Sequence, residues 1–165
     1  MAITAKDVQA LRNSTGVGMM DAKKALEANN GDMEAATQWL RVQGLASAAK
    51  RADREAGEGA VAVVRNGNVA AIVEMRCETD FVAKSQEFTA LVDEIAAAVC
   101  ADGEDAVKGF QDQIENMLTT LKENISVGRV YRLEAGANEV IDTYIHQQSG
   151  RGVNAVAVIV NNGSE

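Results

Sequence analysis

The sequence has no proline, one histidine, two cysteines and only 4% aromatic residues among its 165 positions. So few aromatic side chains leave little surface on which nucleic-acid bases could stack. Cys77 and Cys100 are too few for a disulfide framework or a four-thiolate zinc site, and we expect both to be buried free thiols. Without proline, the turns must be built from the 14 glycines and from Asn and Asp.

Long hydrophobic runs are also absent. No segment approaches 18 consecutive apolar residues, and Lys6, Asp7 and Arg12 interrupt the N-terminal region where a signal peptide would need an apolar stretch. These two observations predict a soluble, cytoplasmic protein without a membrane contact.

The charge is negative and unevenly distributed. The chain carries 16 basic and 24 acidic residues, a net charge of −8, and the whole acidic excess follows residue 56, since the residues up to Ala56 are slightly basic. A protein that binds nucleic acid or an anionic membrane usually presents a basic face, so the charge disfavours both partners. With 47% apolar residues the chain can still bury a core, made mainly of Ala, Val, Ile, Leu and Met.

The N-terminal segment, residues 1–55, has the pattern of three short helices and a linker. Thr4-Ala5-Lys6-Asp7 is a capping box for the first helix, and a second is expected over about Met20 to Asn29. Asp32 is placed to cap a third helix, which we expect to pack around Trp39 and to stop at Gly44. These features predict a small helical bundle.

Residues 56–165 alternate between strand and helix patterns. Asn66-Gly67 separates two alternating runs and predicts a hairpin with a two-residue loop, in which Arg65 pairs with Asn68. That register puts Ala62, Val73 and their alternate neighbours on one apolar face. Further patterns predict helices near 85–101 and 110–121 and strands near 130–133, 140–145 and 153–160. The whole chain is therefore predicted to be α+β, a three-helix bundle followed by a core with β-hairpins packed on helices.

Sequence motifs for catalysis are missing. The run Gly16 to Lys23 lacks the glycine directly before lysine that a phosphate loop needs, and it follows a helix, so direct nucleotide binding is not expected. His146 alone cannot form a multi-histidine metal site, and it is either a polar residue at a strand end or a partner contact. We expect no catalytic residues, no metal and no cofactor.

The segment Glu78 to Lys84 lies where the second hairpin strand ends and helical spacing begins. Thr79 is placed to cap a short helix, which would put Asp80 and Phe81 in its first turn. Two interpretations remain open: a core phenylalanine beside a capping aspartate, or an exposed apolar and acidic tip that contacts a partner.

Two motifs in this chain resemble the signatures of the bacterial elongation factor Ts family. The first is Leu11 to Leu26, LRNSTGVGMMDAKKAL, and the second is Glu74 to Lys84, EMRCETDFVAK. The resemblance runs from Ile3 to about Glu134 and more loosely to Val160. The turn at Gln147 to Val153 departs from the usual pattern of the family.

The resemblance implies a guanine-nucleotide exchange factor for elongation factor Tu, with no enzyme activity of its own. The factor would bind the Tu-GDP complex, disturb its magnesium and phosphate site and release GDP so that GTP can bind. Four residues would act at the magnesium site of the partner: Thr79, Asp80, Phe81 and Val82. Residues that would dock on the partner are Arg12, Met19, Met20 and His146.

For the domains, the resemblance implies that residues 1–55 are a UBA-like partner-docking domain with its linker. Residues 56–165 would be a core with two hairpin-containing subdomains, the second lacking the C-terminal helices common in the family. Three alternatives stay open: Met19 and Met20 as core residues, a docking module without exchange activity, and a small enzyme. The sequence leaves open whether the protein is a monomer or a dimer.

Overall fold

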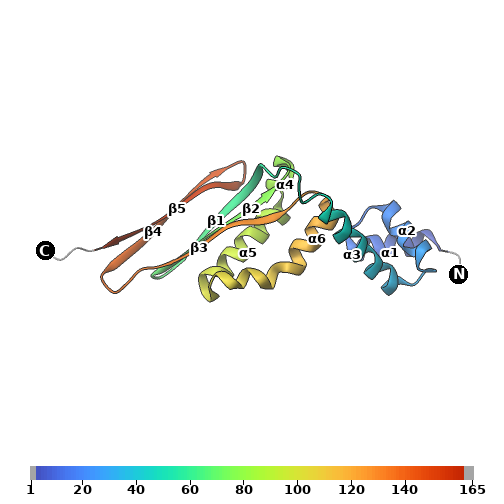
Figure 1. Ribbon diagram of the computed structural model, residues 1–165, viewed down its shortest axis with the longest axis horizontal. Helices are drawn as coiled ribbons and strands as arrows, with labels where there is room; N and C mark the ends of the chain where they lie inside the picture. The colour runs from blue at the N-terminus through green and yellow to red at the C-terminus, as the bar shows by residue number, and fades with distance from the viewer. Residues whose placement is uncertain (1–2, 162–165) are drawn as a thin grey trace. The chain divides into compact units, whose positions relative to one another are not determined.

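The computed structural model describes residues 3–161, which form two compact units (Figure 1). The first unit contains the chain up to Asp53 together with residues 113–123, and the second contains residues 54–112 and the chain from Asn124 onward. The first unit is therefore discontinuous in sequence. It recruits a helical segment that follows almost 60 residues of the second unit.

The first unit is built from helices α1 Ala5–Thr15, α2 Met19–Ala28 and α3 Met33–Ala49, joined by most of α6 Gln111–Leu121. Thr4 and Asp7 form the predicted capping box at the start of α1. The side chain of Asp32 accepts hydrogen bonds from the backbone N–H groups of Glu34 and Ala35, which starts α3 as predicted.

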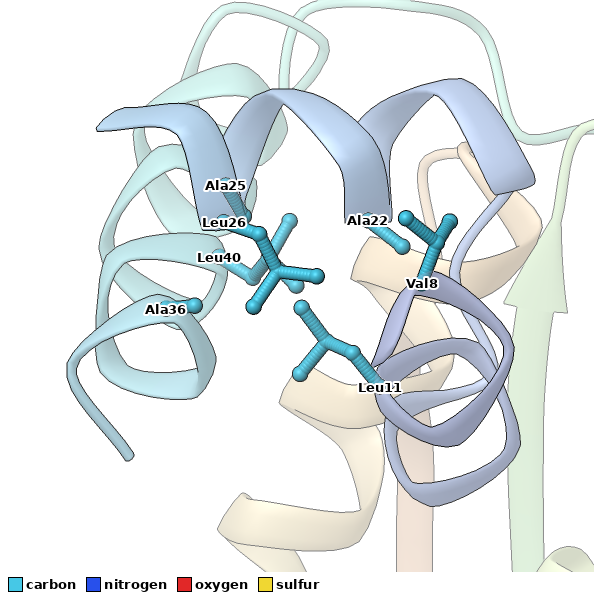
Figure 2. Close-up of a cluster of buried hydrophobic side chains, with 7 residues drawn as sticks. All are labelled: Val8, Leu11, Ala22, Ala25, Leu26, Ala36 and Leu40. Atoms are coloured by element: carbon cyan, nitrogen blue, oxygen red, sulfur yellow. The ribbon is translucent and has the colours of Figure 1, made fainter. Parts of the chain in front are cut away.

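The core of the helical unit consists of small and aliphatic side chains from three helices, and Figure 2 shows them converging between α1, α2 and α3. Leu11 and Leu26 are fully buried at its centre. Trp39, which we expected to organise the packing, is only partly buried and packs against the cluster from its edge. The buried members are Val8, Leu11, Ala22, Ala25, Leu26, Ala36 and Leu40.

The prediction that Gly44 ends the third helix was wrong, because α3 continues through it to Ala49. A Cβ at this position would overlap the side chain of Thr119 on α6. Gly44 therefore serves a close approach between two helices rather than a helix stop.

Ion pairs and a backbone contact also attach α6 and the residues after it to the bundle. Lys122 Nζ lies 2.7 Å from Asp21 Oδ2, and Arg41 Nη2 lies 3.3 Å from Glu115 Oε2. Arg51 donates to the carbonyl oxygen of Leu118 over 2.9 Å. These contacts, added to the Gly44 packing, make the distant segment an integral part of the helical unit.

The second unit contains five antiparallel strands and the helix α5. Strands β1, β2 and β3 form one sheet in that order, and β4 and β5 form a separate hairpin. Helix α5 contacts β1 and β2, and a 3-10 helix, η1, connects α5 to α6. The bounds are β1 Glu58–Asn66, β2 Val69–Cys77, α5 Gln86–Asp102, η1 Glu104–Phe110, β3 Ser126–Glu134, β4 Glu139–Gln148 and β5 Arg151–Asn161.

The first hairpin forms at the predicted place but in a different register. Asn66 pairs with Val69, so the two loop residues are Gly67 and Asn68. Gly67 adopts a positive φ of 60°, which suits glycine at a tight turn. The shift changes the partner of every residue by two positions, and because side chains alternate along a strand, each residue stays on its predicted face.

The two faces of the sheet are covered by different elements. The wholly apolar face includes the buried Ala62 and Val73 and lies on the side of α5. The other face is covered by the β4–β5 hairpin, where Ile141 clusters with Ala70. Gly152, at the start of β5, permits the close approach of β5 to β1, because a Cβ there would overlap the carbonyl oxygen of Val61.

Both cysteines are buried free thiols, as predicted. Cys100, near the end of α5, donates to the carbonyl oxygen of Val69 over 3.8 Å. Within residues 3–161, none of the helices combines the length and the apolar character needed to cross a bilayer.

Candidate functional site

The segment predicted to form a short helix after the second hairpin strand is the one-turn helix α4, Asp80–Ala83, separated from the end of β2 by two residues. Thr79 is its N-cap, and its hydroxyl accepts a hydrogen bond from the backbone N–H of Val82 over 3.4 Å. The second half of the turn is anchored, since Val82 and Ala83 are buried. We call residues 79–82 the tip.

Phe81 is the most exposed large apolar side chain of the second unit, with 84% of its surface accessible. The structure therefore rules out the interpretation of Phe81 as a core residue. Burying such an aromatic side chain against a partner would remove on the order of 150 Å² or more of apolar surface from water. An exposed phenylalanine therefore marks a candidate contact surface.

Asp80 is paired within the tip region. Lys84 Nζ lies 2.5 Å from Asp80 Oδ2 and makes a hydrogen bond as well as an ion pair. That hydrogen bond is the main reason why the pKa of Asp80 is lowered. Desolvation opposes it, and the charges of Lys84 and Arg151 lower the pKa further. The carboxylate is thus ionised at neutral pH.

The base of the tip is braced by neighbouring loops. The thiol of Cys77 donates to the carbonyl oxygen of Thr79 over 3.2 Å. Glu78 Oε1 accepts a 2.6 Å hydrogen bond from the backbone N–H of Asn124 and lies 3.6 Å from Arg54 Nη1. Because these contacts hold the backbone just before the tip, and Val82 and Ala83 are buried just after Phe81, Phe81 projects from an anchored support.

The candidate docking residues of the first unit gather at the corner between α1 and α2. Arg12 is exposed in the last turn of α1, Gly16 ends that helix with a φ of 71°, and α2 begins at Met19. Met19 is 45% exposed and Met20 is 63% exposed. This exposure rules out the interpretation of the two methionines as core residues.

His146 lies on the outward face of β4, opposite Asn154 of β5, next to an irregularity in the hairpin register. Several exposed apolar side chains share that face of the hairpin. They are Val140, Tyr144, Val156, Val158 and Val160. His146 is therefore a surface residue in a partly apolar setting.

Comparison with known proteins identifies the family of the chain. Residues 78–165 match the family model described as Elongation factor TS, and the match begins at the residue just before the tip. The chain belongs to the elongation factor Ts family. Among proteins named Elongation factor Ts, that of Ruegeria pomeroyi is 48% identical over 97% of this chain, that of Parvibaculum lavamentivorans 43% over 96%, and that of Rhizobium meliloti 40% over 97%.

The chain spans a little over half the length of these elongation factor Ts relatives, from 54% to 57%. The family resemblance drawn from the two sequence motifs is confirmed, and so is the α+β fold with its N-terminal helices. Within residues 3–161, no group of three or more His, Cys, Asp or Glu side chains is arranged to hold a metal ion.

Three charged residues near the tip were not predicted from the sequence: Lys84, Arg151 and Glu58. Lys84 had a usable signal, because it follows Asp80 at the i+4 spacing that favours a salt bridge on a helix. Arg151 and Glu58 had none, since their 2.8 Å contact joins residues 93 positions apart. Their place in this elongation factor Ts fold is set by the way the β4–β5 hairpin packs on β1.

Proposed function

We propose that this chain acts in translation elongation in the cytoplasm as a guanine-nucleotide exchange factor for elongation factor Tu. It binds the Tu-GDP complex, disturbs the magnesium and phosphate site and promotes GDP release, so that GTP can bind. The proposal needs no catalytic residue and no cofactor in the chain itself. The observation that carries it is an exposed Phe81 on a braced, buried support in a member of the elongation factor Ts family.

The four tip residues take different parts in this proposal. Phe81 and Asp80 are the groups that meet the partner, Phe81 as an apolar wedge and Asp80 as a negative charge near the metal site. Thr79 and Val82 act on the support side, because one caps α4 and the other is buried beneath it. A wedge displaces structure in its partner only if its own base does not yield.

Exchange follows from differential binding. GDP is held through its phosphates and the magnesium ion, so a factor speeds release only by binding the disturbed state of the partner better than the GDP-bound state. Each ~1.4 kcal/mol removed from the release barrier raises the rate about tenfold. The coupling is reciprocal, which means that nucleotide binding also expels the factor.

A second contact would come from the helical unit. Arg12, Met19 and Met20 form an exposed basic and apolar corner, a composition that suits a protein interface, where methionine and arginine are enriched. We propose that this corner docks on elongation factor Tu and that His146 makes a further contact from β4. These contacts would supply binding, while the tip supplies the change in the partner.

The test is stopped-flow release of a fluorescent GDP analogue from elongation factor Tu, with and without the chain, in excess unlabelled nucleotide. The chain should accelerate release, and Phe81→Ala should lose most of the acceleration. Tyr131→Ala is a matched control, because Tyr131 is also an exposed aromatic residue of the second unit. A normal rate with Phe81→Ala would reject the wedge.

The alternative function is a docking module without exchange activity, which the exposed corner at α1–α2 would also support. It predicts binding to elongation factor Tu without faster GDP release. Titration calorimetry on the same proteins separates the two functions, since a docking module binds Tu-GDP and the nucleotide-free form with equal affinity.

A further inference from the structure

The turn end of the β4–β5 hairpin lies beside the tip, and both belong to the second unit. Together they line a pocket of about 200 Å³. The hairpin contributes the largely buried guanidinium of Arg151, and the tip region contributes the Asp80–Lys84 pair. The lining residues are Glu58, Asp80, Lys84, Gln148, Ser149 and Arg151.

Arg151 ties this end of the hairpin to β1. Its Nη2 lies 2.8 Å from Glu58 Oε2, and its Nη1 donates to the carbonyl oxygen of Gly59 over 2.6 Å. Only 13% of the side chain is exposed. The two bonds go to neighbouring groups of one strand, so the guanidinium is fixed in direction as well as in position.

The same side chain has a cost for folding. Arg151 Nε is buried and has no hydrogen-bond partner among the described residues. An unsatisfied buried donor lowers stability, and a simple apolar residue would avoid that loss. An arginine here therefore combines attachment of the hairpin to β1 with a charge held in the pocket that Asp80 also lines.

The charge of Arg151 reaches Asp80. It acts on the carboxylate together with Lys84, and both favour its ionised form. Three charged groups thus face Asp80 in the pocket: Lys84 from its own segment, Arg151 from β5 and Glu58 from β1. Glu58 is paired with Arg151, and Asp80 is paired with Lys84, at the same pocket.

We infer that Arg151 is a positioning residue for the tip: bonded to Glu58 and Gly59 of β1, it holds its charge in the pocket that Asp80 and Lys84 also line. This role rests on the proposed function, because orientation of Asp80 matters only if the tip acts on a partner. A helix of one turn has few hydrogen bonds of its own, so the direction of its side chains depends on the groups packed beneath it.

The test compares three variants. Arg151→Met removes the charge and both hydrogen bonds while it keeps a long side chain, and Arg151→Lys restores the charge without the two-pronged geometry. Arg65→Met is the matched control, because Arg65 Nη1 also joins β1 to the hairpin, through Asp142 Oδ1 at 3.4 Å, but at the opposite end of β1. Equal damage from the two Met variants would indicate a purely structural role.

Two measurements are made on each variant. The first is the titration of the Asp80 carboxyl carbon by NMR in the chain alone, where Arg151→Met should raise the pKa of Asp80 and Arg65→Met should leave it unchanged. The second is GDP release from elongation factor Tu, where Arg151→Met should lower the acceleration at least about fivefold and Arg151→Lys should recover part of it.

An unchanged Asp80 titration in Arg151→Met would overturn the inference, as would an equal loss of exchange in Arg151→Met and Arg65→Met. If Arg151→Met does not fold, Glu58→Gln loosens the same guanidinium without removing it and must lower exchange in its place. If the unaltered chain fails to accelerate GDP release, the proposed function is wrong, and the NMR titration still decides whether Arg151 positions Asp80.

Discussion

Phe81 and Val82 are consecutive residues of α4, yet Phe81 projects into solvent while Val82 is buried beneath it. The two side chains should therefore respond in opposite ways to truncation. Val82→Ala should lower the free energy of unfolding by about 1–2 kcal/mol through a lost core contact. Phe81→Ala should change it by less than about 0.5 kcal/mol.

Urea unfolding followed by circular dichroism measures both values. The same two proteins should also separate in the GDP release assay, where Phe81→Ala loses activity with an intact fold. A strongly destabilised Phe81→Ala would mean that Phe81 contributes to the core of the second unit, which would contradict its exposed position.

A second prediction concerns Glu74 on β2. Its side chain accepts hydrogen bonds from the guanidinium and the backbone N–H of Arg129 on β3, and Arg76 also donates to it. The side-chain bond from Arg129 is the main reason that the pKa of Glu74 falls from 4.5 to about 2, against the opposing effect of burial.

Because the pKa of Glu74 is lower in the folded chain, the pair stabilises the fold fully above pH 4.5 and loses this contribution as the pH falls toward 2. Glu74→Gln should thus be less stable than the unaltered chain by roughly 1 kcal/mol at pH 7, and the difference should shrink below pH 4.5. Urea titrations at pH 7, 4.5 and 3 test this, with an exposed glutamate such as Glu94 changed to Gln as control. A difference independent of pH would contradict it.

A third prediction concerns Gly152, where β5 approaches β1. An alanine Cβ would overlap the carbonyl oxygen of Val61 and crowd the side chain of Ile145. Gly152→Ala should cost about 1–3 kcal/mol, because strand backbones must move apart. Gly109→Ala is the control, since no atom lies within 4 Å of a Cβ there. Thermal unfolding of both variants checks the prediction, and equal melting temperatures would refute it.

A fourth prediction concerns Gly44 on α3, where replacement by alanine should change the stability in the direction opposite to helix propensity. In an exposed helix, glycine to alanine stabilises by about 1 kcal/mol. Gly44→Ala should instead destabilise the helical unit, because the new methyl group meets Thr119. The double variant Gly44→Ala with Thr119→Ala should recover part of the loss, since the closest atom is a Thr119 methyl carbon. A stabilising Gly44→Ala would disprove the close packing of α3 on α6.

Local chemistry made much of the fold predictable. Helix caps such as Thr4 and Asp32 act within one turn, so the residues that cause the structure lie next to it in sequence. The faces of the first hairpin were also predicted correctly, because alternation depends only on parity. Its register was not, because Asn66-Gly67 and Gly67-Asn68 both offer a residue suited to positive φ, and the local sequence does not distinguish the two loops.

The candidate site was predictable to the extent that it is local. The motif around Phe81 gave the cap at Thr79 and the short helix, but spacing alone left Phe81 either buried or exposed, because burial depends on what packs on α4. The contact of Arg151 with Glu58 and the packing of Gly44 on Thr119 join distant parts of the chain. No local pattern encodes such pairs.

The discontinuity of the helical unit has a consequence for the order of events during synthesis. Helices α1 to α3 leave the ribosome first, but the segment that carries Thr119 and Lys122 follows only after β1, β2 and α5 have emerged. Until then Asp21 lacks its ion pair with Lys122, and the contact surface at Gly44 stays open. The nascent bundle therefore lacks its contacts with α6 while the sheet that follows it is being made.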